Sequence, residues 1–134
     1  MLAAGCGAGS QKFPVVVAHP SVRSTGIPSV KGREATLQPP SWVVFNTPGS
    51  RSCVWWPARL TTLDSRSIRI DMRVHGPVAR CSTGGAELFP IAVKVDPSPV
   101  DFRHPLTVRL AFTVRLPSGK VNAWERTAVA PGLG

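Results

Sequence analysis

Hydrophobic and polar residues alternate most regularly between Pro105 and Lys120. Every second position of this segment is apolar: Leu106, Val108, Leu110, Phe112, Val114 and Leu116. The positions between them are Thr107, Arg109, Ala111, Thr113 and Arg115. Successive side chains of a β-strand point to opposite faces, so this pattern predicts a strand with one apolar face and one basic, wettable face. The Pro-Ser-Gly sequence at 117–119 predicts a hairpin turn directly afterwards.

A second segment, residues 67–75, alternates in the same way. Its apolar positions are Ile68, Ile70, Met72 and Val74, and Arg69, Asp71 and Arg73 point to the other side. Shorter apolar and β-branched runs predict strands at 13–18, near 35–37, at 41–46, at 53–63 with a bend or break at Pro57, and at 88–95. Turn-forming residues separate these runs at 47–50, 64–66, 76–77 and 82–85. The single helix candidate is the segment 121–130.

Seven to nine short strands separated by turns predict an all-β fold. We expect a single-domain antiparallel β-sandwich or small β-barrel with short strands and Pro/Gly-rich loops. A chain of 134 residues is long enough to bury one hydrophobic core. The expected boundaries are a flexible N-terminal tail at 1–12, one β domain at 13–130 and a C-terminal tail at 131–134.

The chain is strongly basic. Sixteen Lys and Arg residues against seven Asp and Glu residues give a formal net charge of +9, and arginine outnumbers lysine. This balance favours contact with nucleic acid, an anionic membrane surface or an acidic protein. Because no block of five like charges occurs, the positive charge belongs to the folded part of the chain and not to a basic tail.

Arginine side chains on the two alternating segments form the candidate binding site. Arg69 and Arg73 share the polar face of one strand, and Arg109 and Arg115 share that of the other. If these strands are neighbours, four guanidinium groups line one sheet surface and can make bidentate contacts with phosphate or carboxylate. Trp55 and Trp56 are candidates for an aromatic interface beside them. The alternative is a polar face that needs only solvation.

The sequence offers little support for catalysis, for a metal site or for a cofactor. The three histidines, His19, His75 and His104, lie in separate segments, and no G-x-S-x-G motif accompanies them. Cysteine and histidine do not occur at the spacings of zinc ligands, and the glycine pair at 84–85 lacks the Lys-Ser/Thr of a phosphate-binding loop. We therefore expect a protein that is not an enzyme.

The N-terminal sequence allows a second interpretation. Leu2-Ala3-Ala4-Gly5-Cys6 resembles the lipobox of bacterial lipoproteins, whose cysteine is acylated, and it would make Cys6 a lipidation site if the true start lies upstream. Cys53 and Cys81 would then remain as a possible pair, whereas in a cytosolic protein they would be reduced. No apolar run approaches the roughly 18 residues of a membrane-spanning helix, so we expect no transmembrane segment.

Two further segments resemble known families. Trp55-Trp56-Pro57-Ala58-Arg59 resembles the signature of PWWP domains, small barrels that cage a methylated lysine and hold DNA on a basic surface. The upstream glycine register and the downstream aromatic-Gly-Asp element of that family are missing. Residues 58–70 with the long strand are similar to PilZ domains, which bind cyclic-di-GMP, but the Asp, Ser and Gly of the D-x-S-x-x-G motif are all replaced at 62–67. We assign the chain to neither family.

We therefore expect a non-enzymatic binding or structural subunit of a larger assembly, such as a virion or a ribonucleoprotein. Its basic sheet face would contact a polyanion, nucleic acid in particular, or an acidic partner chain, and other protein subunits would accompany it. An intracellular or virion-associated location fits this interpretation. The alternatives are an extracytoplasmic lipoprotein with a β-sandwich body anchored through Cys6 and, more distantly, a degenerate PilZ-like nucleotide-binding barrel.

Overall fold

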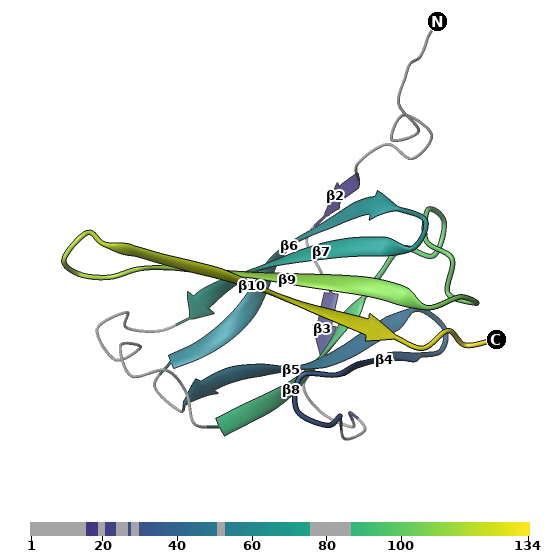
Figure 1. Cartoon of the computed structure of the whole chain (residues 1–134), viewed down its shortest axis with the longest axis horizontal. Helices are drawn as coiled ribbons and strands as arrows, with labels where there is room; N and C mark the ends of the chain where they lie inside the picture. Colours follow the sequence, from purple (N-terminus) through teal and green to yellow (C-terminus); the bar gives the residue numbers. More distant parts are fainter. Residues whose placement is uncertain (1–15, 19–20, 24–26, 28–29, 51–52, 76–86) are drawn as a thin grey trace, which may run out of the picture.

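The computed structural model describes residues 16–18, 21–23, 27, 30–50, 53–75 and 87–134. Regular secondary structure in these residues consists of β-strands (Figure 1). The strands are β2 (Val16–Ala18), β3 (Ser21–Arg23), β4 (Ala35–Gln38), β5 (Trp42–Ser50), β6 (Cys53–Asp64), β7 (Ser67–His75), β8 (Glu87–Lys94), β9 (Leu106–Arg115) and β10 (Val121–Ala130). The all-β class predicted from the sequence is confirmed.

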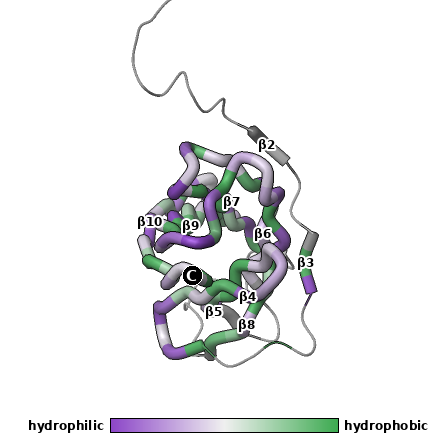
Figure 2. Tube along the Cα trace, turned by 90° about the vertical axis from the view of Figure 1, so that its right-hand side faces the viewer, coloured by the Kyte–Doolittle hydropathy of each residue, from purple (hydrophilic) through white to green (hydrophobic). Residues whose placement is uncertain are grey.

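The strands form two packed layers that do not close into a barrel. One layer has the order β10-β9-β7-β6 with β2 beside β6, and the other contains β4, β5, β8 and β3 (Figure 2). The end of β5 pairs with the start of β6 through Gly49↔Val54 and Ser50↔Cys53, so the chain passes from one layer to the other there. All pairings are antiparallel except that of β7 with β9, which is parallel. Of the two predicted architectures, the molecule adopts the sandwich.

The alternating positions of β7 and β9 supply the centre of the core. Ile70 and Leu110 are opposite each other across the parallel ladder, and neither exposes any surface. The facing layer contributes Val43, Phe45 and Val93, which are equally inaccessible. Arg69 and Arg109 point away from this core because they occupy the intervening positions. The two faces predicted for these strands are therefore confirmed.

The helix candidate at 121–130 is wrong, because this segment is strand β10. All of its residues pair with β9 in one uninterrupted antiparallel register, from Val121↔Arg115 to Ala130↔Leu106. Once the 117–119 turn reverses the chain, the free edge of β9 offers a hydrogen-bond partner to every second residue of the segment. Gly119, at a φ of 91°, takes the left-handed conformation that this turn requires.

The predicted turn at 47–50 is also wrong, because β5 continues to Ser50 along β8. Pro48 is tolerated there because the pairing of β5 with β4 ends at Phe45 and that with β6 begins at Gly49, which leaves Pro48 with a paired strand on one side only. The predicted bend at Pro57 is confirmed as a register shift between Pro57 and Arg59. In the next turn, the backbone N–H of Arg66 donates to Asp64 Oδ1 at 2.8 Å.

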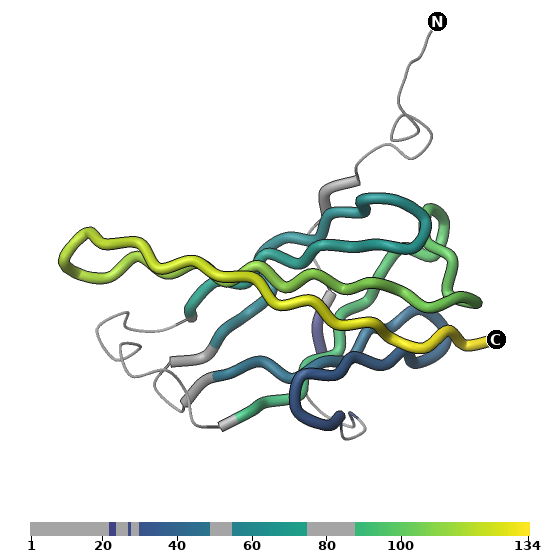
Figure 3. Tube along the Cα trace, in the orientation of Figure 1, coloured from purple at the N-terminus to yellow at the C-terminus, as the bar shows by residue number. Residues whose placement is uncertain are grey.

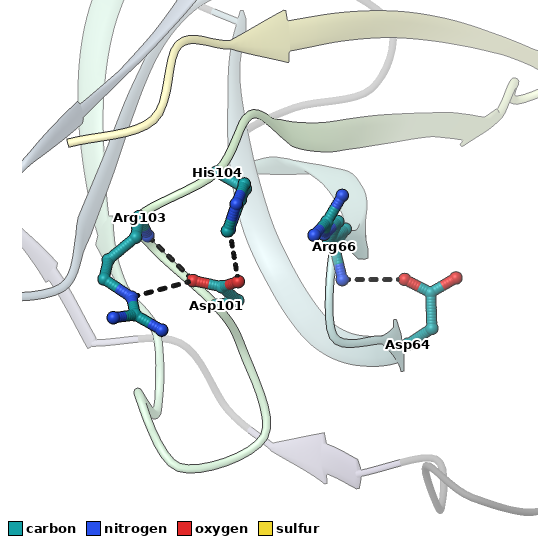
Figure 4. Close-up of polar contacts among 5 residues, drawn as sticks. All are labelled: Asp64, Arg66, Asp101, Arg103 and His104. Atoms are coloured by element: carbon teal, nitrogen blue, oxygen red, sulfur yellow. Dashed lines mark hydrogen bonds and ion pairs between the residues drawn. The ribbon is translucent and has the colours of Figure 1, made fainter. Parts of the chain in front are cut away.

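The connection between β8 and β9 is held against the β6–β7 turn and the chain end. The Asp101 N–H donates to the carbonyl of Ser65 at 2.7 Å, and the Asp101 carboxylate lies 2.7 Å from His104 Nδ1 (Figure 4). Its other oxygen accepts the Arg103 N–H at 2.9 Å. Residues 131–134, expected to be a tail, lie along this connection, where Leu133 N–H donates to Phe102 O at 2.8 Å.

Leu110→Ala tests the importance of the core. The substitution leaves a cavity between the layers, so we expect the free energy of unfolding in urea to fall by about 2–5 kcal/mol. Leu133→Ala is the matched control, because Leu133 is 43% exposed and its loss should change stability by less than about 0.5 kcal/mol. Equal effects of the two substitutions would contradict this assignment of the core.

Asp101→Asn tests the bracing of the β8–β9 connection. The Arg103 N–H and the His104 hydrogen bond lower the pKa of Asp101 below its ordinary value of 3.8. The charged carboxylate is therefore favoured by folding, and its stabilising effect is present above pH 3.8 and is lost as the pH falls through the lower folded-state pKa. In urea unfolding, the wild type should be more stable than the variant at pH 6, and the difference should shrink near pH 3. A difference that does not depend on pH would refute this role.

Candidate functional site

The parallel pairing of β7 with β9 brings the predicted arginines together. Arg69 lies directly opposite Arg109, and Arg73 lies opposite Thr113 on the same side of the sheet. Arg115 follows two residues beyond Thr113 on β9, where the neighbouring strand is β10. All four arginines are exposed. Since Arg109 and Arg115 are six residues apart on one strand, the row extends about 20 Å along β9.

Arg59 of β6 joins this surface, although the sequence pattern did not single it out. It is exposed and pairs with Asp71, the residue between Arg69 and Arg73 on β7. Uninterrupted alternation from the buried Trp55 would turn Arg59 inward, but the bulge after Pro57 shifts the alternation by one residue. We use the name arginine face for the outward side of β6, β7 and β9 that carries Arg59, Arg69, Arg73, Arg109 and Arg115.

Carboxylates compensate only part of this charge. Arg69 Nε lies 3.2 Å from Asp71 Oδ1, and the Asp71 side chain is 15% exposed. A second carboxylate, Glu125 on β10, occupies the same side of the sheet opposite Ala111. No carboxylate among the described residues forms an ion pair with the other four arginines of the face, which are Arg59, Arg73, Arg109 and Arg115. The face therefore keeps unpaired guanidinium groups that are available to an anion.

A shallow depression lies between Arg69 and Glu125. Small side chains of β9 and β10, namely Ala111, Thr113 and Ala123, line it together with Phe112 and Trp124. Because these side chains are short, the surface of the sheet is recessed between the longer side chains around them. An anionic group can therefore approach Arg69 from this side without displacing a bulky residue.

The two adjacent tryptophans lie on opposite sides of the sheet. Trp55 is 5% exposed and packs edge-on against Phe112 and Trp124, with ring centroids 5.3 and 5.2 Å apart. It is a core residue, so its predicted place in an exposed aromatic interface is wrong. Trp56 is 39% exposed and lies opposite Arg73, on the arginine face. Only Trp56 of this pair is available to stack on a ligand.

Among the side chains that the structure describes, no group of possible metal ligands accompanies this face. In the described residues, His104 contacts the Asp101 carboxylate, and no three His, Cys, Asp or Glu side chains are grouped to hold a metal ion. Cys6 and Cys81 lie outside the described residues. Within the part of the chain that the structure describes, no helix is long and apolar enough to cross a bilayer. The arginine face is thus the strongest candidate site.

Comparison with known proteins adds no relative to this picture: no family model, no curated protein and no solved structure matches the chain.

Arg109→Thr tests whether repulsion between Arg69 and Arg109 destabilises the folded protein. Like charges on directly neighbouring strands repel, so removing the Arg69–Arg109 pair should raise the free energy of unfolding by about 0.2–1 kcal/mol at low salt. The gain should shrink in about 1 M salt, where the Debye length is near 3 Å. Arg66→Thr in the exposed β6–β7 turn removes the same charge without relieving a cross-strand pair and should give no such gain. A salt-independent gain, or one equal to that of the control, would argue against repulsion on the face.

Proposed function

We propose that this protein is a non-enzymatic binding subunit that contacts nucleic acid through the arginine face. The observation that carries the proposal is the placement of Arg69 opposite Arg109, with three further exposed arginines on the same side of the sheet. We expect such an arrangement to cost stability in the free protein, because like charges directly opposite each other on neighbouring strands repel. A bound polyanion would remove that cost.

The chemistry of the face suits phosphate. A guanidinium group presents a planar fork of N–H donors that matches two phosphate oxygens, and it stays charged at every physiological pH. Each phosphate neutralised by an arginine releases counterions into solution, which adds a favourable term that depends on salt. Because its five arginines face two carboxylates, Asp71 and Glu125, the surface presents a local positive field.

Single-stranded nucleic acid fits the shape of this surface best. The face is one side of a sheet, and an exposed aromatic ring, Trp56, lies directly beside Arg73. Single strands splay their bases and stack them on aromatic side chains while basic residues follow the backbone. The shallow depression between Arg69 and Glu125 leaves room for the sugar-phosphate backbone to pass.

The double variant Arg73→Ser/Arg109→Ser tests the proposal. Binding to a fluorescent single-stranded RNA of about 20 nucleotides, followed by anisotropy at several salt concentrations, should weaken at least tenfold at low salt. The slope of log affinity against log salt should fall by about 0.7 for each phosphate that the variant no longer neutralises. Trp56→Ala should weaken binding with little change in that slope, because stacking releases no counterions.

Arg66→Ser/Arg103→Ser is the matched control. It removes the same total charge from two exposed residues in connecting segments, the β6–β7 turn and the β8–β9 connection. We expect a much smaller loss of affinity than for the variant on the face. Equal losses in the two double variants would show that net charge alone attracts the RNA. Wild-type binding that does not respond to salt would rule the proposal out, and preference for polyglutamate over RNA would move the assignment to an acidic protein partner.

A further inference from the structure

Strand β10 ends its layer with an edge to which no described strand is hydrogen-bonded. The order of the layer begins with β10, whose one hydrogen-bonded neighbour there is β9. The C-terminal half of β10 lies beside β4, and Arg126 Nη2 donates to the Asn46 carbonyl at 2.5 Å. The N-terminal half belongs to the β9–β10 hairpin, which projects past the other strands (Figure 3). Residues 121–125 are exposed at five consecutive positions, so both faces of β10 are accessible there.

The backbone groups that face outward can be assigned from the hairpin. The N–H of Leu116 donates to the carbonyl of Lys120 at 2.8 Å, which makes this opposed pair a hydrogen-bonded one. Hydrogen-bonded and non-hydrogen-bonded pairs alternate along an antiparallel ladder. The even-numbered residues of β10 therefore bond to β9. Val121, Ala123, Glu125 and Thr127 direct their N–H and C=O groups toward the open edge.

This edge lacks several of the features that normally prevent strands from pairing, and its charged residues are Glu125 and Arg126. It is ten residues long, contains no Pro or Lys, and its register with β9 shows no bulge. Three of its residues are large exposed hydrophobic side chains: Val121, Trp124 and Val129, with exposures of 46%, 46% and 59%. Long, regular and apolar edges of this kind pair readily with a further strand.

We propose that a second copy of the chain pairs with this edge, β10 against β10, in an antiparallel two-fold arrangement centred on Trp124. In this register Ala123 pairs with Glu125 of the second copy, and Val121 pairs with Thr127. Each of these pairs uses outward-facing N–H and C=O groups on both strands. Trp124 then lies opposite its own copy in a non-hydrogen-bonded pair, where opposed side chains come closest.

Charge and burial favour this register over those centred nearer the C-terminal end of β10. A two-fold axis at Glu125 would place the two carboxylates opposite each other, and an axis at Arg126 would oppose two guanidinium groups; both arrangements are repulsive. An axis at Thr127 would extend the pairing to residues 128–130, at the end of β10 that lies beside β4. The axis at Trp124 sets Glu125 against alanine and Arg126 against Asn122, so no like charges meet.

The arrangement also gives Trp124 a partner for its exposed surface. Its ring is stacked on Phe112 with centroids 5.2 Å apart and planes 9° from parallel, and it contacts Trp55 edge-on. The second copy would extend this aromatic cluster across the axis. A two-fold axis perpendicular to the sheet leaves the arginine faces of both copies on the same side, but the pairing rests on the β10 edge alone and needs no nucleic acid.

Ala123→Pro separates edge pairing from folding. Proline removes an N–H that points to the open edge and leaves the β9–β10 hydrogen bonds intact, whereas Ala123→Val keeps the N–H and a side chain in the same place. By sedimentation equilibrium of the full chain between about 1 and 300 μM, wild type and Ala123→Val should form dimers. Ala123→Pro should be monomeric while it keeps the circular dichroism spectrum and cooperative melting of the wild type.

A disulfide trap checks the register. With the native cysteines replaced by serine, Trp124→Cys should cross-link into a covalent dimer under mild oxidation, because self-opposed residues in a non-hydrogen-bonded pair fit disulfide geometry. Asn122→Cys lies opposite Arg126 in the proposed register and should not cross-link. A wild type that stays monomeric at 300 μM, a dimer that survives Ala123→Pro, or cross-linking of Asn122→Cys in preference to Trp124→Cys would each overturn the proposal. Loss of RNA binding in a protein that still dimerises would overturn only the proposed function.

Discussion

The parallel pairing of β7 with β9 is the constraint on which the other features of this protein depend. Its register sets Ile70 beside Leu110 inside the sandwich and, by the same alternation, Arg69 beside Arg109 outside it. Because side chains alternate with a period of two, a slip of one residue in either strand would turn its arginines into the core. The chain reaches this pairing indirectly, since β7 is followed by β8 in the opposite layer before β9 returns beside it. The core and the candidate site are therefore two sides of one ladder.

The inner face of the β7–β9 ladder stabilises the fold, whereas we expect its outer face, with two opposed arginines, to destabilise it. Burial of apolar side chains on the inner face provides the main driving force of folding, at about 25 cal/mol per Å² of apolar surface. The outer face opposes two guanidinium groups and offers the Asp71 carboxylate, which pairs with Arg69. Exposed ion pairs of this kind contribute about 0–1 kcal/mol. The core can thus support opposed arginines, and in the proposed function a bound anion would relieve their repulsion.

The β9–β10 hairpin contributes to both proposed binding surfaces, which face in perpendicular directions. Side chains of β9 point out of the plane of the sheet, where Arg109 and Arg115 join the arginine face. Backbone groups of β10 point within the plane, toward a second copy. A ligand on the face and a strand on the edge therefore do not compete for the same atoms. In the proposed dimer, two arginine faces would form one continuous surface, and a long polyanion that spans both would gain from their linkage.

Local alternation was enough to predict much of this molecule. It identified β7 and β9, the burial of residues such as Ile68 and Val108, and the outward direction of Arg69, Arg73, Arg109 and Arg115. These features follow from the period of the strand, which is written in the order of the residues. The bend at Pro57 was predictable for a similar reason, because proline cannot continue a regular ladder.

The tertiary structure decided everything that depends on which strands meet. Segment 121–130 has little local preference for a strand, and it became β10 because the edge of β9 was available to it. Arg59 faces outward and Trp55 inward because of the bulge and the packing around Phe112, which no local pattern of apolar residues contains. On the regular strands β7 and β9, the sequence thus determined the direction of each side chain. Only the pairing of β7 with β9, a contact between residues distant in the chain, decided that four of those arginines share one surface.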